Sequence, residues 1–306
     1  MQDGLWDREV DLLVAGAGPA GMTAALVAAL EGLDVLICEK SEQVGGTGAT
    51  SAGTLWIPGN GPGREAGYDD SAGEAGAYLD ALIGDGGADP RREIFLSDGP
   101  RVIDDLIART ELRLVACGPH PDYRSNLPGA AFSGRAIIPE PFDGRKLGRD
   151  FCRVRSPIDE FMLLGGMMAG KADIQRLVGR YQSLGNFAHS VGLVLRYLAD
   201  RLRFARGTRL VMGNALVAQL FHSLRENGVP ILFGTAIADL VNEDGRVTGA
   251  VVETAAGPIR IHARNGVVLA TGGFAHNEKY RAAFMPTPRP AHSMAVAENT
   301  GDGLEM

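Results

Sequence analysis

The part of the chain that most constrains its fold lies between residues 9 and 40. The apolar run "EVDLLVAGAG" ends in glycines, and Pro19 then opens a helical stretch that continues to about Gly32. A second apolar run, "LDVLICEK", follows directly. Buried parallel strands are near-continuous apolar runs, and proline is favoured at the first position of a helix. The pattern therefore predicts a strand–helix–strand unit at the start of a parallel sheet.

The turn between the first predicted strand and the helix carries the pattern Gly16-x-Gly18-x-x-Gly21, and Glu39 ends the second strand. Gly16 permits a tight turn, Gly18 lets the backbone approach a pyrophosphate, and Gly21 lets the helix pack closely on the strand. The free N–H groups at the start of the helix favour phosphate, and Glu39 can accept hydrogen bonds from ribose hydroxyls. These features together predict a dinucleotide site. Glu39 would repel a 2′-phosphate, which disfavours NADP and leaves NAD and FAD.

The stretch "VGGTGATSAGTLWIPGN", residues 44–60, begins five residues after Glu39. Its glycines and hydroxyls are those of a flexible linker, but a linker needs no Trp56-Ile57-Pro58 step. In flavoprotein folds the chain beyond the acidic residue returns along the flavin, where small residues and backbone donors are needed. The stretch is therefore interpreted as a cofactor loop and favours FAD. An NAD dehydrogenase would place a second strand–helix–strand half near residues 60–120, where helices are expected instead.

Helix signals recur through the middle of the chain. Ser71-Ala-Gly-Glu74 has the spacing of a capping box and predicts a helix over 72–83, while Asp89 before Pro90 predicts another helix start. Residues 118–149 are rich in Pro and Gly without a clear period and are expected to form a long ordered excursion. Helical patterns return between about 172 and 227.

The last third of the chain consists of short β runs separated by turn residues. Asp244-Gly245 predicts one hairpin, and Gly257-Pro258 predicts another turn. The run "GVVLATGG" then repeats the form of the first strand, with glycines at its end. Two glycine-ended strands that lie far apart in the sequence predict one sheet built from distant parts of the chain.

Composition excludes several classes of protein. A chain of 306 residues with 45% hydrophobic and 22% charged residues is typical of a soluble globular protein. The formal charge of −7 argues against a nucleic-acid or anionic-membrane partner, and the basic stretch "RYLADRLRFARGTR", residues 196–209, is interpreted as a solvated helix face. The cysteines Cys38, Cys117 and Cys152 are widely spaced, which suits a cytoplasmic location and gives no disulfide or zinc framework. The histidines also lack metal-ligand spacing.

A membrane span must also be considered, because the segment from Leu12 to Leu30 holds nineteen residues without a charge. The residues before it are net acidic, whereas a signal peptide begins with basic residues. Three glycines and Pro19 interrupt the segment at close spacing. A buried strand, a turn and a packed helix are therefore expected, and no membrane span.

Five motifs carry a resemblance to a known family: "LLVAGAGPAGMTAA", "CEKSEQVGGTGATSAGTLWIP", "PEPFDGRKLG", "NGVVLATGGFAHN" and "ENTGDGLEM". Together they resemble the 3-ketosteroid Δ1-dehydrogenase branch of the fumarate reductase/succinate dehydrogenase flavoprotein superfamily, over nearly the whole chain. The resemblance implies an α/β fold, namely a Rossmann-like FAD-binding domain with a parallel central sheet, a β-meander and a helical excursion. That domain would span 1–275, with the excursion at about 61–210, and 276–306 would begin a truncated capping substrate domain.

The resemblance also implies a set of cofactor-binding residues. It assigns the FAD phosphates and adenosine ribose to Gly16, Gly18, Ala20, Gly21 and Glu39. It assigns the flavin side to Thr47, Gly48, Ser51, Ala52 and Gly53, and adds Lys40, Thr50 and Asp302 to the site. Ile237 would contact adenine through its backbone, and Gly272 and Gly273 would close over the cofactor. Residues 44–60 hold no histidine for a covalent link, so FAD is expected to bind non-covalently.

The chemistry implied by the resemblance is desaturation of a ring next to a ketone. A base removes a proton beside the carbonyl while flavin N5 takes a hydride from the neighbouring carbon, and hydrogen-bond donors on the carbonyl make that proton acidic. In the ketosteroid enzymes tyrosines fill these roles, and the segment "PDYRSNLPG" makes Tyr123 the catalytic candidate. The alternative is that Tyr123 only packs its ring in the excursion at 118–149. The implied substrate is a small apolar ketone, with a steroid among the candidates, and the electron acceptor stays open.

Members of the family continue for well over a hundred residues beyond the point that corresponds to "NTGDGLEM". The missing part would hold other catalytic residues, so the chain is expected to be an N-terminal portion whose flavin is partly uncovered. Either it is a fragment, or a second polypeptide completes the site. Two rival functions stay open: an alkene reductase of the fumarate or urocanate type, and an FAD-binding half without activity.

Overall fold

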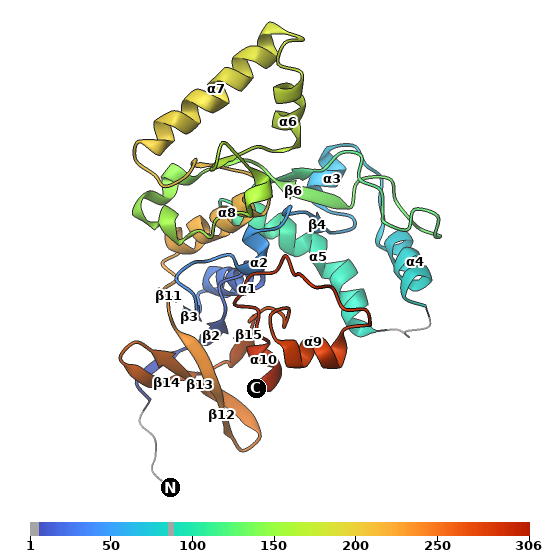
Figure 1. Ribbon diagram of the computed structural model, residues 1–306. Helices are drawn as coiled ribbons and strands as arrows, with labels where there is room; N and C mark the ends of the chain where they lie inside the picture. Colours follow the sequence, from blue (N-terminus) through green and yellow to red (C-terminus); the bar gives the residue numbers. More distant parts are fainter. Residues whose placement is uncertain (1–5, 85–88) are drawn as a thin grey trace. The chain divides into compact units, whose positions relative to one another are not determined.

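The computed structural model describes residues 6–84 and 89–306 (Figure 1). The chain divides into two compact units. The first consists of the chain up to Ser51 together with Pro141–Met306, and the second consists of Ala52–Glu140. Each unit contains its own β-sheet structure, and the two units are described in turn.

The first unit is built on a four-stranded parallel sheet. Its strands are β2 (Leu12–Ala15), β3 (Val35–Cys38), β11 (Ile231–Leu232) and β15 (Val267–Leu269), in the order β11-β3-β2-β15. Strand β15 pairs with β2 in parallel, with Val267 opposite Leu13 and Leu269 opposite Ala15. The two glycine-ended strands predicted from the sequence therefore lie side by side, and the parallel α/β architecture is confirmed.

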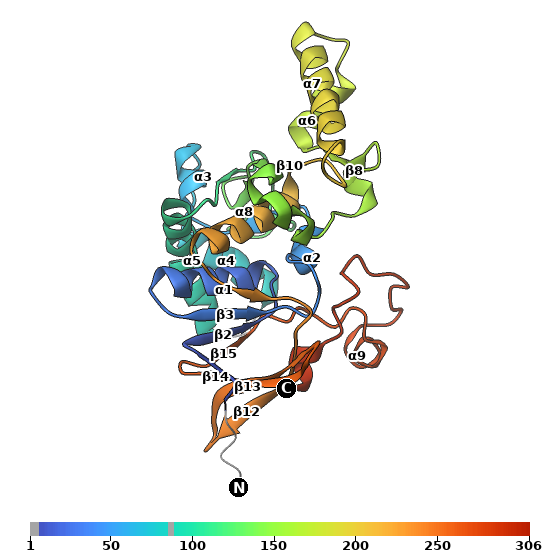
Figure 2. The same ribbon diagram turned by 90° about the vertical axis from the view of Figure 1, so that its left-hand side faces the viewer.

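Helix α1 (Pro19–Leu30) covers one face of this sheet, and helix α8 (Met212–Glu226) packs on the outer side of α1 (Figure 2). Helix α1 buries Met22, Ala25 and Leu26 and contacts β2, β3 and α8. The segment from Leu12 to Leu30 is thus a strand, a turn and a packed helix. In the described part of the chain, no helix combines the length and apolar character that a membrane crossing requires.

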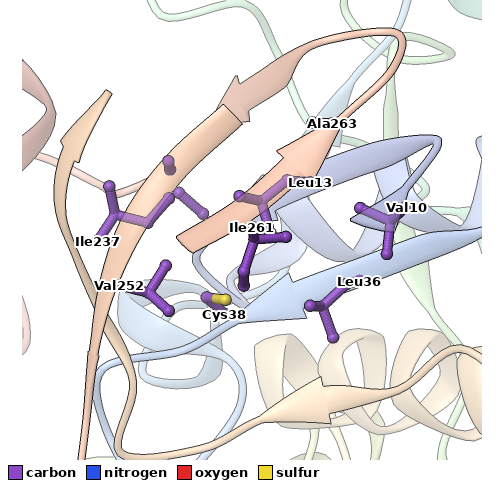
Figure 3. Close-up of a cluster of buried hydrophobic side chains, with 10 residues drawn as sticks. Val10, Leu13, Leu36, Cys38, Ile237, Val252, Ile261 and Ala263 are labelled. Atoms are coloured by element: carbon purple, nitrogen blue, oxygen red, sulfur yellow. The ribbon is translucent and has the colours of Figure 1, made fainter. Parts of the chain in front are cut away.

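The opposite face of the parallel sheet packs against a β-meander. The meander consists of β12 (Ala236–Glu243), β13 (Arg246–Thr254) and β14 (Gly257–Ala263), and strand β1 (Arg8–Val10) joins it in the order β1-β14-β13-β12. Figure 3 shows the core between the two sheets, where Leu13 and Leu36 meet Val252 and Ile261. All four of these side chains are fully buried, so the meander is fixed to the parallel sheet by apolar packing.

Two local predictions in this unit are wrong. The first apolar run is two strands in different sheets, because the chain breaks at Asp11, whose carboxylate accepts hydrogen bonds from the Asp34 N–H and from Arg264. The second turn of the meander lies at residues 255–256, while Gly257, with φ of 115°, already begins β14. The Asp244-Gly245 turn is confirmed, and both residues have the positive φ that a tight hairpin requires.

The rest of the first unit includes a helical hairpin, which lies away from the parallel sheet in both views (Figures 1 and 2). It consists of α6 (Lys171–Val178) and α7 (Leu184–Arg201). The remaining elements are listed here in chain order: α2 (Gly46–Ala49), β7 (Phe142–Asp143), η1 (Gly144–Arg153), η2 (Asp159–Phe161), β8 (Met162–Leu163), β9 (Met167–Met168), β10 (Arg209–Leu210), α9 (Glu278–Phe284) and α10 (Asp302–Glu305).

The basic stretch at 196–209 is not one solvated helix face, because helix α7 ends at Arg201. Beyond the helix, Arg206 is buried over the ring of Phe151 and donates to the carbonyl of Val154 at 3.2 Å. Burial lowers the pKa of Arg206 to about 10. Arg209 is held by Asp173 at 2.7 Å. The interpretation as a solvated helix face is therefore wrong for the end of the stretch, where Arg206 and Arg209 contact other segments of the unit.

The described residues of the second unit form a three-stranded antiparallel sheet and three helices. The strands β4 (Leu55–Trp56), β6 (Ala136–Pro139) and β5 (Leu114–Ala116) lie in that order. The helices are α3 (Gly61–Glu65), α4 (Ala72–Ile83) and α5 (Pro90–Arg109). The side chains of Ser71 and Asp89 cap α4 and α5, so both predicted helix starts are confirmed.

Candidate cofactor-binding site

The first unit contains a cavity of about 440 Å³ at the carboxyl ends of its parallel strands. The turn between β2 and α1, the end of β3, the loop with α2 and residues 270–272 after β15 all line it. Residues 296–306 close another side. In open α/β sheets, ligands bind at this edge because the strand ends and helix N-termini converge there.

The three glycines of the first turn have different surroundings. Gly16 has φ of 100°, and a Cβ built on it would lie 2.5 Å from the carbonyl oxygen of Ala270. A Cβ on Gly21 would lie 1.9 Å from the carbonyl oxygen of Gly16, so helix and strand touch there. A Cβ on Gly18 would meet nothing within 4 Å, and Gly18 lines the cavity. Gly16 and Gly21 thus allow close packing, whereas the missing side chain of Gly18 leaves room for a ligand.

Helix α1 begins at the cavity without a capping side chain. Gly18 is its N-cap residue, Pro19 is its first residue, and no described side chain bonds the N–H groups of its first turn. Such N–H groups, together with the positive end of the helix dipole, favour a phosphate.

Glu39 lies at the end of β3 and is almost fully buried. One carboxylate oxygen accepts the N–H of Ala17 at 2.7 Å, and the other accepts the N–H of Ser41 at 2.9 Å. These bonds fix the carboxylate against the glycine turn. A carboxylate offers about four acceptor sites, so Glu39 retains capacity for hydroxyl donors from the cavity.

The segment at 296–306 is tied to the rest of the site by Lys40. The ammonium of Lys40 donates to the Asp302 carboxylate at 2.7 Å and to the Thr300 hydroxyl at 2.8 Å. Burial raises the pKa of Asp302, but the hydrogen bonds from Lys40 and Thr300 and the charge of Lys40 outweigh it. The pKa of Asp302 therefore lies below its usual range, and the carboxyl is ionised at neutral pH.

A second ion pair lies across the same cavity. Arg155 donates to Glu298 at 2.9 Å, and the bond and charge of Arg155 bring the pKa of Glu298 below its usual range although burial opposes this. The Arg155 Nε and Glu298 Oε2 atoms are buried without a partner among the described residues. Buried polar groups are normally paired, so these two atoms fit a site that is completed by a polar ligand.

The loop with α2 packs closely against the glycine turn and the segment at 296–306. A Cβ on Gly48 would lie 2.3 Å from the ring of Pro19. The hydroxyl of Thr47 accepts from the Asn299 side chain at 3.0 Å and from the Val296 N–H at 3.3 Å. The first half of the stretch at 44–60 is therefore an ordered wall of the cavity, while its second half, from Ala52, belongs to the second unit.

The cavity brings most of the sequence-predicted residues together. Those that line it are Gly16, Gly18, Ala20, Glu39, Lys40, Thr47, Gly48, Ile237, Gly272 and Asp302. The predicted residues Gly21, Thr50, Ser51 and Gly273 lie in the same unit but are not among the lining residues. Ala52 and Gly53 lie in the second unit.

Sequence reasoning missed several lining residues, chiefly Gly45, Gly46, Arg155, Thr235, Glu298 and Asn299. Glu298 and Asn299 belong to the motif "ENTGDGLEM", so that motif could have identified them as residues of the site. Arg155 lies in no motif, and only the fold reveals its place.

The catalytic candidate Tyr123 lies in the second unit, and its side chain is 96% exposed. The alternative that its ring packs in the excursion is therefore wrong. The neighbouring Asp122 is buried and is held by Arg135 at 2.7 Å and by the indole N–H of Trp56 at 2.7 Å. The loop thus anchors Asp122 and presents Tyr123 to solvent.

The site combines a parallel sheet, a glycine turn at a helix N-terminus, an acidic residue at the end of a strand and a polar cavity. This combination defines a dinucleotide-binding α/β protein. Comparison with known families narrows the class: residues 11–306 match the FAD binding domain model. The chain belongs to the FAD binding domain family.

Characterised relatives are similar over nearly all of this chain. A 3-oxosteroid 1-dehydrogenase from Mycolicibacterium smegmatis is 37% identical over 304 residues, which cover 97% of this chain and 52% of that protein. A 4-oxocyclohex-2-ene-1-carboxylate 5-dehydrogenase from Sinomonas cyclohexanicum is 36% identical over 277 residues, covering 90% of this chain and 46% of that protein.

A solved structure agrees with these relatives. The 3-ketosteroid delta1-dehydrogenase from Sterolibacterium denitrificans, in complex with 1,4-androstadiene-3,17-dione, superposes with a TM-score of 0.88 and 33% identity. The match covers 97% of this chain and 54% of that chain. The resemblance to the ketosteroid branch is confirmed, and this chain spans about half the length of the relatives it matches.

Proposed function

We propose that this chain provides the FAD-binding part of an oxidoreductase that removes hydrogen from adjacent ring carbons beside a ketone. The similarity to 3-oxosteroid 1-dehydrogenases over 97% of the chain carries this proposal. The cavity supports it independently, because its donors and acceptors suit a dinucleotide. In this proposal residues 1–275 form the FAD-binding domain, and 276–306 begin a capping substrate domain.

The residues of the cavity divide into parts that suit different parts of FAD. The backbone at Gly18 and the first turn of α1 would hold the pyrophosphate, and Glu39 would hold the adenosine ribose. Ile237 points its side chain into the core between the two sheets, so its backbone is left to contact adenine.

Thr47 and Gly48 would lie on the flavin side of this site, with Thr50, Ser51, Ala52 and Gly53 following them along the chain. Lys40, Asp302, Gly272 and Gly273 would enclose the cofactor. Residues 44–60 contain no histidine, which supports non-covalent binding.

Bound FAD supplies the hydride acceptor for such a desaturation. The protein must supply a proton acceptor and donors to the ketone oxygen. The exposed hydroxyl of Tyr123 is the group that this chain offers for proton transfer. Among the relatives one acts on an oxosteroid and another on an oxocyclohexene carboxylate. The proposed substrate is therefore an apolar cyclic ketone, and we place a steroid first. The free cysteines support a cytoplasmic location.

The test uses the FAD-loaded protein with a dye as electron acceptor. We expect turnover of a 3-ketosteroid, or a shift of the flavin spectrum when the steroid binds. Tyr123→Phe should lower the turnover sharply, whereas Tyr181→Phe, at another exposed tyrosine, should leave it unchanged. Reduction of fumarate without any response to ring ketones would instead identify an alkene reductase. A protein that binds FAD but responds to neither would be an inactive FAD-binding half.

A further inference from the structure

The first unit contains another cavity, of about 670 Å³, which shares no lining residue with the cofactor cavity. Two segments that lie far apart in the sequence form most of it: residues 148–156, in and after η1, and residues 203–206, in the loop beyond α7. Its lining includes Arg149, Arg203 and Arg206, and no acidic residue is among the described residues that line it. Because arginine keeps its proton at neutral pH, the lining carries a concentrated positive charge.

Arg206 is the most deeply buried charge of this cavity, with 7% of the residue exposed. Its Nη2 atom donates to the carbonyl of Val154 at 3.2 Å, and its guanidinium lies over the ring of Phe151. Its Nη1 atom is buried and has no hydrogen-bond partner among the described residues. Burial lowers the pKa of Arg206 to about 10, so the group is still charged at neutral pH. Buried arginines are normally paired with an anion, and this guanidinium therefore fits an anionic ligand.

The neighbouring arginines differ from Arg206 because each has a carboxylate partner. Arg153 pairs with Glu42, and Arg155 pairs with Glu298 at 2.9 Å. These two carboxylates are therefore engaged elsewhere, and no described carboxylate offsets the burial of Arg206. Since Arg153 and Arg155 are both less buried than Arg206, the arginine with the greatest need of a counter-charge is the one that the described residues leave without it.

We propose that this cavity binds a small polyanion through its phosphate or carboxylate oxygens, with Arg206 as the most buried contact. A guanidinium matches the geometry of such oxygens and binds them with charge-assisted hydrogen bonds. The exposed side chains of Arg149 and Arg203 would neutralise further charge, and the hydroxyl of Ser156 adds a donor. The net charge of −7 on the whole chain disfavours a nucleic acid as the source of the anion. This proposal is independent of the FAD chemistry.

The test is calorimetric titration of the FAD-loaded protein with pyrophosphate and, separately, with citrate at constant ionic strength. Loading with FAD occupies the cofactor cavity, so binding of the added anion there is not measured. We expect at least one of the two anions to bind saturably, with one anion per chain, and the stronger of them identifies phosphate or carboxylate as the preferred group. The variant R149Q/R203Q should weaken this binding by about tenfold or more. The matched control R101Q/R246Q removes the same charge at exposed positions outside the cavity and should bind like the parent protein.

The exposed thiol of Cys152 lines the cavity and gives a second readout of its occupancy. At an anion concentration ten times the dissociation constant, alkylation of Cys152 by iodoacetamide should slow about tenfold. The rate at Cys117, which lies in the second unit, should stay the same.

The variant R206M, once circular dichroism has verified its fold, should lose the rise in melting temperature that the anion gives the parent protein. The proposal is overturned if neither anion binds, if R149Q/R203Q binds as tightly as the parent, or if a saturating anion leaves the alkylation of Cys152 unchanged. A folded R206M variant that the anion stabilises as much as the parent also overturns it.

Discussion

At the scale of single residues, Arg135 is the most completely enclosed charge among the described residues of the second unit. Its guanidinium donates to Asp122 at 2.7 Å and to Asp70 at 3.0 Å, and it lies over the rings of Trp56 and Tyr78. All three charged side chains are nearly inaccessible. The cluster therefore ties the loop that carries Tyr123 to the sheet of this unit.

Replacing Arg135 with Met should destabilise the protein by about 3–5 kcal/mol, because two carboxylates would be left buried without their cation. Arg101→Gln, which breaks an exposed pair with Asp98, should cost less than about 1 kcal/mol. Urea unfolding monitored by tryptophan fluorescence measures both. An R135M variant as stable as R101Q would show that the cluster does not hold this unit together.

Substitution by alanine should affect FAD affinity at Gly18 and stability at Gly21. Gly18→Ala has room for its methyl group, so the protein should fold and lose about tenfold or more in FAD affinity. Gly192→Ala, also free of any clash, is the matched control that should keep the affinity. Gly21→Ala places its methyl group against the Gly16 carbonyl and should lower the melting temperature. If G18A retains full FAD affinity, the pyrophosphate does not lie at this turn.

At the scale of helices and strands, the sequence predicts those elements whose formation depends on residues nearby in the chain. The caps at Ser71 and Asp89, the apolar run of β3 and the helix opened by Pro19 all depend on neighbours in the chain, and all are found where expected. The errors arise where tertiary contacts decide. Asp11 splits one apolar run into two strands through bonds to the distant Arg264, which periodicity cannot detect.

The ion pair between Lys40 and Asp302 also joins distant parts of the chain, so the sequence alone does not reveal it. It gives a pH-dependent prediction. The pKa of Asp302 is lower in the folded chain than in the unfolded chain. Its contribution to stability is therefore present above about pH 4 and is lost as the pH falls through the folded-state pKa. Asp302→Asn should be less stable than the parent at pH 7, and this difference should shrink as the pH falls below about 4 and vanish once the pH is below the folded-state pKa of Asp302.

Thermal unfolding as a function of pH measures the difference between the D302N variant and the parent. Asp98→Asn, at an exposed i,i+3 pair, controls for the change in net charge. A D302N difference that persists unchanged in acid would show that the Lys40–Asp302 pair is not its source.

At the scale of the whole molecule, the cofactor cavity is assembled from segments that lie far apart in the sequence. Its motif-bearing walls, the glycine turn and Glu39, could be predicted because the chemistry of phosphate and ribose recognition fixes their spacing. Arg155 and Thr235 could not, since each reaches the cavity only through the packing of its unit.

Titration of the purified chain with FAD tests the central claim most directly. We predict saturable uptake that shifts the visible flavin spectrum and reaches one FAD per chain. Denaturation should then release all of the flavin into solution, as non-covalent binding requires. A folded chain that takes up no FAD would contradict the assignment of this cavity, and flavin that stays attached after denaturation would contradict the non-covalent mode.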